Sequence, residues 1–303
     1  MKTNAKVPRL INNFVNIFRP EPQVYPGADG NELRHGQWYD EWVPNDHTFT
    51  MGPDGNWHIF GISHPLTTAA NIHEGEDQLF HAVAPGDVFD KPLTPKCFRD
   101  CGTVLAPGDR PGEPNPIYAP FIIKIEKLYH IVYGPFAIRH RVSENLVNWQ
   151  ELRPMFSEPP QLGTRDPHIL FHDGKYYLTY CAFNEIRQRV STDMTTWSDY
   201  RTIRVAPTEI AAPESPFIVF HDGMFYLIFC PWSGVWDQKT VAQAYPHITE
   251  IHVSPTVDGF MDTEPIAIFD AHAIEVVPVG KRYFLASAEW PERGINVAEM
   301  VFE

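Results

Sequence analysis

The sequence predicts an all-β fold, a five-bladed β-propeller with four-stranded antiparallel blades around a central axis. Five segments share one plan, in which a polar start, a short apolar strand, a turn and an aromatic-rich strand follow one another. Near the starts of three of them, Pro120, Pro167 and Pro216 recur after 47 and 49 residues, a period that suits propeller blades. The 29 prolines also disfavour long helices.

The first two strands of each blade can be placed from this repeat. They are expected at residues 45–63, 118–134, 165–181, 214–230 and 272–289. The motifs 143-SENLVNWQ-150 and 191-STDMTTWS-198 are typical of the turn between the third and fourth strands. The last copy, which ends at 294–303, is one strand short, and the N-terminal segment 1–40 is expected to complete it through residues 9–17. We therefore predict a single domain over residues 1–303.

Charge and cysteine content limit the partners. The formal net charge of −14, with 38 acidic and 24 basic residues, argues against nucleic acid and against an anionic membrane surface as partners. The N-terminus has no uninterrupted apolar run and no cleavage pattern, so a cytoplasmic location is expected, with secretion left open. The four cysteines are expected to be reduced. Sequence patterns give no oligomeric state.

Three carboxyl groups are expected to meet at one end of the ring. In a propeller, the starts of all first strands lie around the same mouth, and these starts hold Asp46, Ala119, Asp166, Glu214 and His272. A single acid at a turn is more often a structural cap, but three acids at equivalent ring positions favour chemistry. Glycoside hydrolysis uses such a set, with one carboxyl as acid and another as base or nucleophile.

The ordered motifs NDHTF, YAPFI, RDPHI, ESPFI and HAIEV, with the Trp-containing turns, resemble glycoside hydrolase family 43 over residues 40–303. The resemblance implies a glycosidase that needs no cofactor, inverts configuration and acts from chain ends on arabinofuranosyl or xylosyl residues of an oligosaccharide or glycoside. It also implies roles for three residues: Asp46 as general base, Asp166 as pKa modulator and Glu214 as general acid.

The chain departs from the family pattern at three places. Asp46 is followed by His47 where Pro is usual, no Asp follows Pro120, and Glu214 is followed by Ser215 where Gly is usual. These departures bear on the substrate more than on the three acids.

Two alternatives remain open. The motif 42-WVPND-46 resembles that of family 32, whose members cleave fructosides with retention, although the β-sandwich usual in that family is missing from these 303 residues. An inverting pair of carboxyls stands ~6.5–9.5 Å apart and a retaining pair ~5–5.5 Å apart. The second alternative is a sugar-binding propeller without catalysis, which would not need three acids together.

Loops between second and third strands should form the rim of the mouth. Aromatic candidates to stack on a sugar are Trp42, Trp232, Trp236 and Trp290. Arg187 is expected to bind hydroxyl groups, and the histidine candidates for substrate contact are His47, His73 and His272. The resemblance also implies a histidine near the axis that contacts a central ion, so His272 is a candidate metal ligand and a structural Ca²⁺ on the axis is left open.

Overall fold

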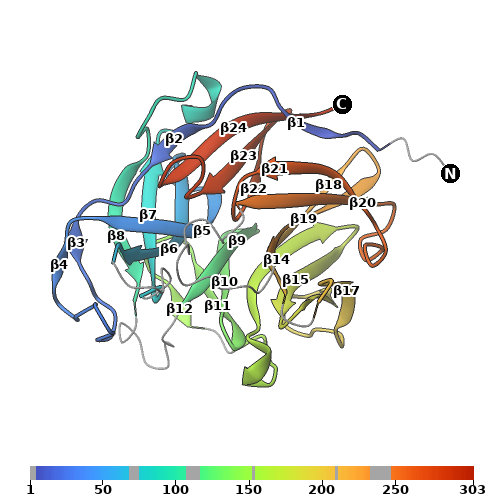
Figure 1. The fold of residues 1–303 in the computed structure, drawn as a ribbon, viewed down its shortest axis with the longest axis horizontal. Helices are drawn as coiled ribbons and strands as arrows, with labels where there is room; N and C mark the ends of the chain where they lie inside the picture. The colour runs from blue at the N-terminus through green and yellow to red at the C-terminus, as the bar shows by residue number, and fades with distance from the viewer. Residues whose placement is uncertain (1–4, 68–74, 107–116, 152–153, 209–210, 233–246) are drawn as a thin grey trace.

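The computed structural model describes residues 5–67, 75–106, 117–151, 154–208, 211–232 and 247–303. The prediction of a five-bladed β-propeller is confirmed, because five antiparallel sheets surround a common centre (Figure 1). The described part of the chain has no helix of the length and apolar character that a membrane span requires.

Blades 1 to 4 follow one another along the chain, each with four strand positions. The strands of blade 1 are β5 Trp42–Met51, β6 Trp57–Pro65, β7 Gln78–Ala84 and β8 Arg99–Leu105. Those of blade 2 are β9 Tyr118–Ile125, β10 Leu128–Gly134, β11 Ala137–Ser143 and two short outer strands, β12 Gln150–Glu151 and β13 Phe156–Ser157. Those of blade 3 are β14 Arg165–His172, β15 Lys175–Ala182, β16 Glu185–Ser191 and β17 Arg201–Val205. Those of blade 4 are β18 Ala212–His221, β19 Met224–Trp232, β20 Ile248–Ser254 and β21 Pro265–Asp270.

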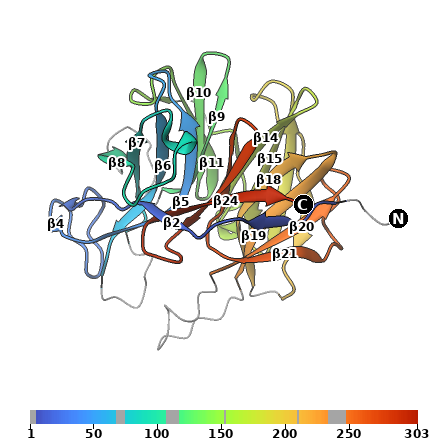
Figure 2. The same ribbon diagram turned by 90° about the horizontal axis from the view of Figure 1, so that it is seen from above.

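Blade 5 is built from both ends of the chain. Its strands are β22 Glu275–Val279, β23 Arg282–Ala288, β24 Ile295–Phe302, β1 Pro8–Leu10 and β2 Val15–Phe18. Both β1 and β2 pair with β24, so the N-terminal segment supplies the outermost strand of the last blade. Strand β1 accordingly lies beside the C-terminus (Figure 1), and Figure 2 shows the same ring turned by 90°.

Three short elements lie outside the blades. A two-stranded ribbon joins β3 Gln23–Val24 to β4 Trp38–Tyr39 ahead of blade 1. Two 3₁₀ turns, η1 Val88–Asp90 and η2 Pro160–Leu162, lie in connections.

The repeated Asp-Gly pairs form two-residue hairpin turns. In blade 3 the turn is Asp173-Gly174, with φ of 49° and 72°, and in blade 4 it is Asp222-Gly223, with φ of 49° and 80°. Two successive positive φ angles define the type I′ turn, whose twist matches that of the strands and which favours Asp-Gly. The repeat therefore marks backbone geometry and carries no function of its own.

The hydrophobic core lies between neighbouring blades. Phe49 and Trp57 of blade 1 pack with Phe284 and Val297 of blade 5, and comparable clusters fill each of the other four seams. Trp149 also lies in such a seam and is buried. Because each blade buries its faces against two neighbours, the strand starts are fixed relative to one another around the axis.

Candidate active site

The first strands of the blades begin with the same irregularity. A two-residue bulge separates Pro44 from His47 in blade 1, Tyr118 from Phe121 in blade 2, Arg165 from His168 in blade 3 and Glu214 from Phe217 in blade 4. We number the residue before the bulge as position 1 and the two residues of the bulge as positions 2 and 3. Glu214 is then at position 1 of its blade, Asp166 at position 2 and Asp46 at position 3. The expectation that the three acids occupy equivalent positions is therefore corrected: the counterpart of Asp166 in blade 4 is Ser215.

The second position of the motif has left-handed backbone in four blades. The φ angle is 39° at Ala119, 55° at Asp166, 49° at Ser215 and 46° at Ala273. Non-glycine residues seldom adopt this region, and their recurrence at one structural position makes it part of the propeller's design.

Ser215 and Arg165 connect the three acids. The Ser215 hydroxyl donates a short hydrogen bond to Oδ1 of Asp46, and the Ser215 amide donates to Oδ2 of Asp166 at 3.1 Å. The Arg165 guanidinium lies 3.3 Å from Oδ2 of Asp166 and 3.4 Å from Oε1 of Glu214. Carboxyls from blades 1, 3 and 4 thus form one connected cluster, as the sequence predicts for Asp46, Asp166 and Glu214.

Burial and mutual repulsion raise the pKa values of Asp46 and Asp166. Burial, followed by the charge of Asp166, raises the pKa of Asp46 well above its ordinary value, and the Ser215 hydrogen bond opposes that rise. Burial raises the pKa of Asp166 to about 6 against the pull of Arg165. Since the two groups interact, they titrate as a pair. Glu214 is the more accessible acid, with 19% of its side chain exposed against 7% for Asp166.

A fourth carboxyl, Glu76, lies at the same mouth. It is buried, and its Oε1 accepts a hydrogen bond from the side-chain amide of Asn45 at 2.9 Å. The oxygen of the same side-chain amide lies 3.1 Å from Nε2 of His272. Glu76 contributes to the raised pKa of Asp46 and, after burial, to that of Tyr118, which reaches about 12. Glu76 was not predicted as a site residue, and the acidic run 73-HEGE-76 was the available signal.

A small cavity of about 30 Å³ lies on the axis beside the cluster, with room for a water molecule. Asp46, Asp166 and Ser215 line it together with His47, His168 and Glu275. Burial lowers the pKa of His47 to about 4 and raises that of Glu275 to about 8. His47 therefore faces the axis as a neutral ring.

The described residues around the axis form no recognisable calcium site. Calcium takes six to eight oxygen ligands, whereas the described residues hold no group of three or more His, Cys, Asp or Glu arranged for a metal. Oxygens of Asp46, Asp166 and Glu275 accept hydrogen bonds from the protein, and His272 contacts Asn45. An axial ion stays a prediction, and no step below depends on it.

The structure places Trp42 in a buried position, where it does not stack on a substrate as predicted. Trp42 is buried in a cluster with Tyr25 and Leu33, and its indole N–H donates to the Tyr39 carbonyl at 3.1 Å. Residues of the N-terminal segment pack against this ring, which leaves 3% of the residue exposed, beside a cavity that none of the three acids lines.

The guanidinium of Arg187 is likewise occupied by contacts with other residues of the protein. It donates to Glu158 at 2.6 Å and to Glu185 at 2.7 Å, and its guanidinium stacks 4.0 Å from the Tyr200 ring. The Glu158 side chain is only 4% exposed, and a buried carboxylate needs such partners. Arg187 stabilises the connection before β14 instead of meeting a ligand.

Two of the aromatic candidates lie on accessible surface. Trp290 is 39% exposed and stacks on His247 with ring centroids 4.9 Å apart, and His247 in turn meets the His272 ring edge-on at 5.9 Å. Trp232 lines a cavity of about 340 Å³ together with Pro213, the neighbour of Glu214. His73 and Trp236 lie outside the described residues.

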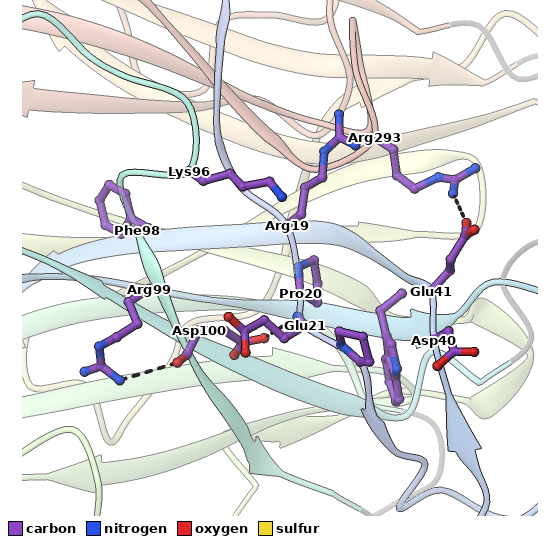
Figure 3. Close-up of a pocket in the computed structure, with 12 residues that line it drawn as sticks. Arg19, Pro20, Glu21, Asp40, Glu41, Lys96, Phe98, Arg99, Asp100 and Arg293 are labelled. Carbon is purple, nitrogen blue, oxygen red and sulfur yellow. Dashed lines mark hydrogen bonds and ion pairs between the residues drawn. The ribbon is translucent and has the colours of Figure 1, made fainter.

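A larger cavity of about 540 Å³ lies where the N-terminal segment crosses blades 1 and 5 (Figure 3). None of the three acids lines it. Its four basic side chains are matched by four acidic ones, and Figure 3 shows Arg293 paired with Glu41, 2.7 Å apart. This balance of charges favours neither an anionic nor a cationic ligand. The cavity is therefore a weaker candidate for the active site than the carboxyl cluster.

Carboxyls from three blades that are connected in one cluster at one end of a propeller form the kind of site that can hydrolyse glycosidic bonds. A sequence profile for Glycosyl hydrolases family 43 matches residues 161–301, the part that holds Asp166 and Glu214, which confirms the resemblance that the motifs predict. No curated protein matches the chain.

Solved structures confirm the fold over nearly the whole chain. An exo-1,5-α-L-arabinanase from a bovine ruminal metagenomic library has 16% identity and a TM-score of 0.60, covering 86% of this chain and 94% of its own. CoXyl43, a GH43 β-xylosidase/α-arabinofuranosidase from a compost microbial metagenome, has 14% identity and a TM-score of 0.59, with coverage of 98% and 95%. A structure reported for the GH130 family of mannoside phosphorylases, which contains glycoside hydrolases, has 13% identity and a TM-score of 0.66, with coverage of 99% and 95%. Family match and fold together support a glycoside hydrolase.

Proposed function

We propose that the protein is an inverting glycoside hydrolase that releases terminal arabinofuranosyl or xylosyl residues from an oligosaccharide or glycoside. The observation that carries the proposal is the cluster of Asp46, Asp166 and Glu214, drawn from three blades and connected by Ser215 and Arg165. The sugar and the exo-action are proposed from the names of the similar arabinanase and xylosidase.

In this mechanism Glu214 donates a proton to the glycosidic oxygen as the bond to the anomeric carbon breaks. Asp46 accepts a proton from a water that attacks the same carbon from the opposite face. Asp46 acts as base only when ionised, so activity should rise with pH as the Asp46–Asp166 pair loses its proton. Glu214 is suited to the acid role because it is the more exposed of the two acids that Arg165 contacts.

Asp166 is proposed to orient the substrate beside Glu214. Its carboxyl is fixed by the Ser215 amide and the Arg165 guanidinium. The exposed Trp290–His247 stack is proposed as the platform for the sugar's apolar face.

The test is a panel of aryl glycosides of arabinofuranose, xylose, fructose and mannose, read by released chromophore. We expect turnover of a pentoside, and a first-formed product of inverted configuration by NMR. Retained configuration would reject inversion, and binding of these sugars without turnover would reject hydrolysis.

Glu214→Gln should lower kcat on glycosides with poor leaving groups by about a hundredfold or more, because general-acid catalysis is removed. KM should change little. The matched control is Glu264→Gln, an exposed carboxyl in the same blade that should retain full activity. Equal activity of both variants would contradict the role of Glu214.

A further inference from the structure

Ser215 contacts two of the three acids through different atoms. Its hydroxyl donates to Asp46 of blade 1, and its backbone amide donates to Asp166 of blade 3 at 3.1 Å. The residue itself belongs to β18 of blade 4, directly after Glu214. It therefore lies where the three acid-bearing blades meet.

We propose that Ser215 is a positioning residue of this site, whose hydroxyl holds the Asp46 carboxylate in its working orientation while its amide holds Asp166. This inference rests on the proposed hydrolase function. It assigns a task to the residue at which the chain departs from the glycine expected after Glu214.

The fold does not require a hydroxyl at this position. The structurally equivalent residues are Ala119 in blade 2 and Ala273 in blade 5, with φ of 39° and 46° beside 49° for Ser215. Both alanines are buried and adopt this left-handed backbone without a polar side-chain atom. Polar side chains occur at the second position in the three other blades. They are Asn45 in blade 1, which donates to Glu76, and Asp166 and Ser215 in blades 3 and 4, which meet the acid cluster.

Glycine would be the easier choice for the backbone. A left-handed φ costs a non-glycine residue conformational energy that glycine avoids. The side chain of Ser215 therefore carries a backbone cost that glycine would avoid, and the hydrogen bond to Asp46 offsets it. Because the serine oxygen donates its proton to Oδ1, the other carboxylate oxygen of Asp46 stays available for a water.

The hydrogen bond also acts on the charge of Asp46. Acidic groups from three elements face Asp46, namely Asp166, Glu76 and Glu214, and each opposes its ionisation. The neighbouring cation, Arg165, contacts Asp166 and Glu214. The hydroxyl of Ser215 favours the ionised form of Asp46, which the base role requires.

The experiment compares Ser215→Ala and Ser215→Gly with the unaltered protein in kcat and KM from pH 4 to pH 9. Both variants keep the backbone amide and lose the hydroxyl. We expect kcat near pH 5 to fall about ten- to a hundredfold, as for loss of a hydrogen bond to a charged group, with KM within about twofold. The acidic limb of the kcat–pH profile should move to higher pH by the same amount in both variants.

A merely structural role predicts a different result. The two variants will differ in thermal stability under either role, because alanine costs more than glycine at φ of 49°, but a merely structural role would leave the acidic limb of both kcat–pH profiles in place. That outcome, with both proteins folded by circular dichroism, would overturn the proposal.

A readout without turnover separates this proposal from the proposed function. In protein labelled with ¹³C at the aspartate carboxyls, the Asp46 signal is identified by its absence in Asp46→Asn and is titrated in each Ser215 variant. A titration midpoint at higher pH in both variants supports the role of Ser215 even if no glycoside is hydrolysed. An unchanged midpoint rejects it even if hydrolysis is demonstrated.

Discussion

Burial on the axis changes the protonation state of single side chains. Glu275 begins β22, accepts a hydrogen bond from the Phe49 amide at 3.0 Å, and has a pKa raised by burial to about 8. It is therefore a neutral carboxylic acid at pH 7. The folded protein holds this proton where the unfolded chain, with a pKa near 4.5, has released it.

Glu275→Gln should flatten the dependence of stability on pH. A raised pKa in the folded state means that the unaltered protein loses stability as pH rises from about 4.5 to about 8, with one pKa unit corresponding to about 1.4 kcal/mol. Glutamine does not titrate, so urea unfolding should show the variant gaining a few kcal/mol over the parent between pH 5 and pH 8. Glu264→Gln is the exposed control, and parallel curves for all three proteins would refute the assignment.

Short sequence motifs specify individual turns of the blades, as the two turns that begin with Ser143 and Ser191 show. In 191-STDMTTWS-198 the Ser191 hydroxyl accepts hydrogen bonds from the amides of Asp193 and Met194, and the Asp193 carboxylate accepts from the next two amides. The turn 143-SENLVNWQ-150 repeats this arrangement with Ser143 and Asn145. The buried side chains of Leu146 and Met194 then fill the seam between blades.

Ser191→Ala should destabilise the protein by about 1–3 kcal/mol, because two amides lose their acceptor where the side chain is buried. The measurement is the midpoint of urea unfolding. Thr196→Ala in the same turn serves as control, since the hydrogen bond described there uses only the Thr196 backbone. Equal midpoints for the two variants would show that the serine does not hold the turn.

Local patterns predicted the strands, the turns and the three acids, but not contacts between distant segments. The bulge that offsets Glu214, Asp166 and Asp46 depends on pairing with the second strands, which a single sequence does not display. Trp42 appeared to be a rim residue because its cover comes from the N-terminal segment. Arg187 appeared free because its partner Glu158 lies 29 residues away along the chain.

At the scale of the whole molecule, the ring is closed by the N-terminal segment on blade 5. Val7 and Glu303 exchange backbone hydrogen bonds of 2.6 and 3.1 Å, and β1 and β2 cover the outer edge of β24. The same segment reaches blade 1, because Phe18 is fully buried and stacks on Phe80 with ring centroids 4.7 Å apart. Closure thus joins the first and last blades, and Asp46 and His272 with them.

Phe18→Ala should test whether this closure stabilises the entire ring. Removing a fully buried phenyl ring costs about 3–5 kcal/mol, whereas Ile11→Ala, in the same segment with 54% of its surface exposed, should cost no more than about 0.5 kcal/mol. If the five seams unfold as one cooperative unit, tryptophan fluorescence and circular dichroism will report the same lowered urea midpoint for Phe18→Ala. An early transition seen by one probe alone would mean that the N-terminal segment detaches separately. The ring would then hold its carboxyl cluster together without it.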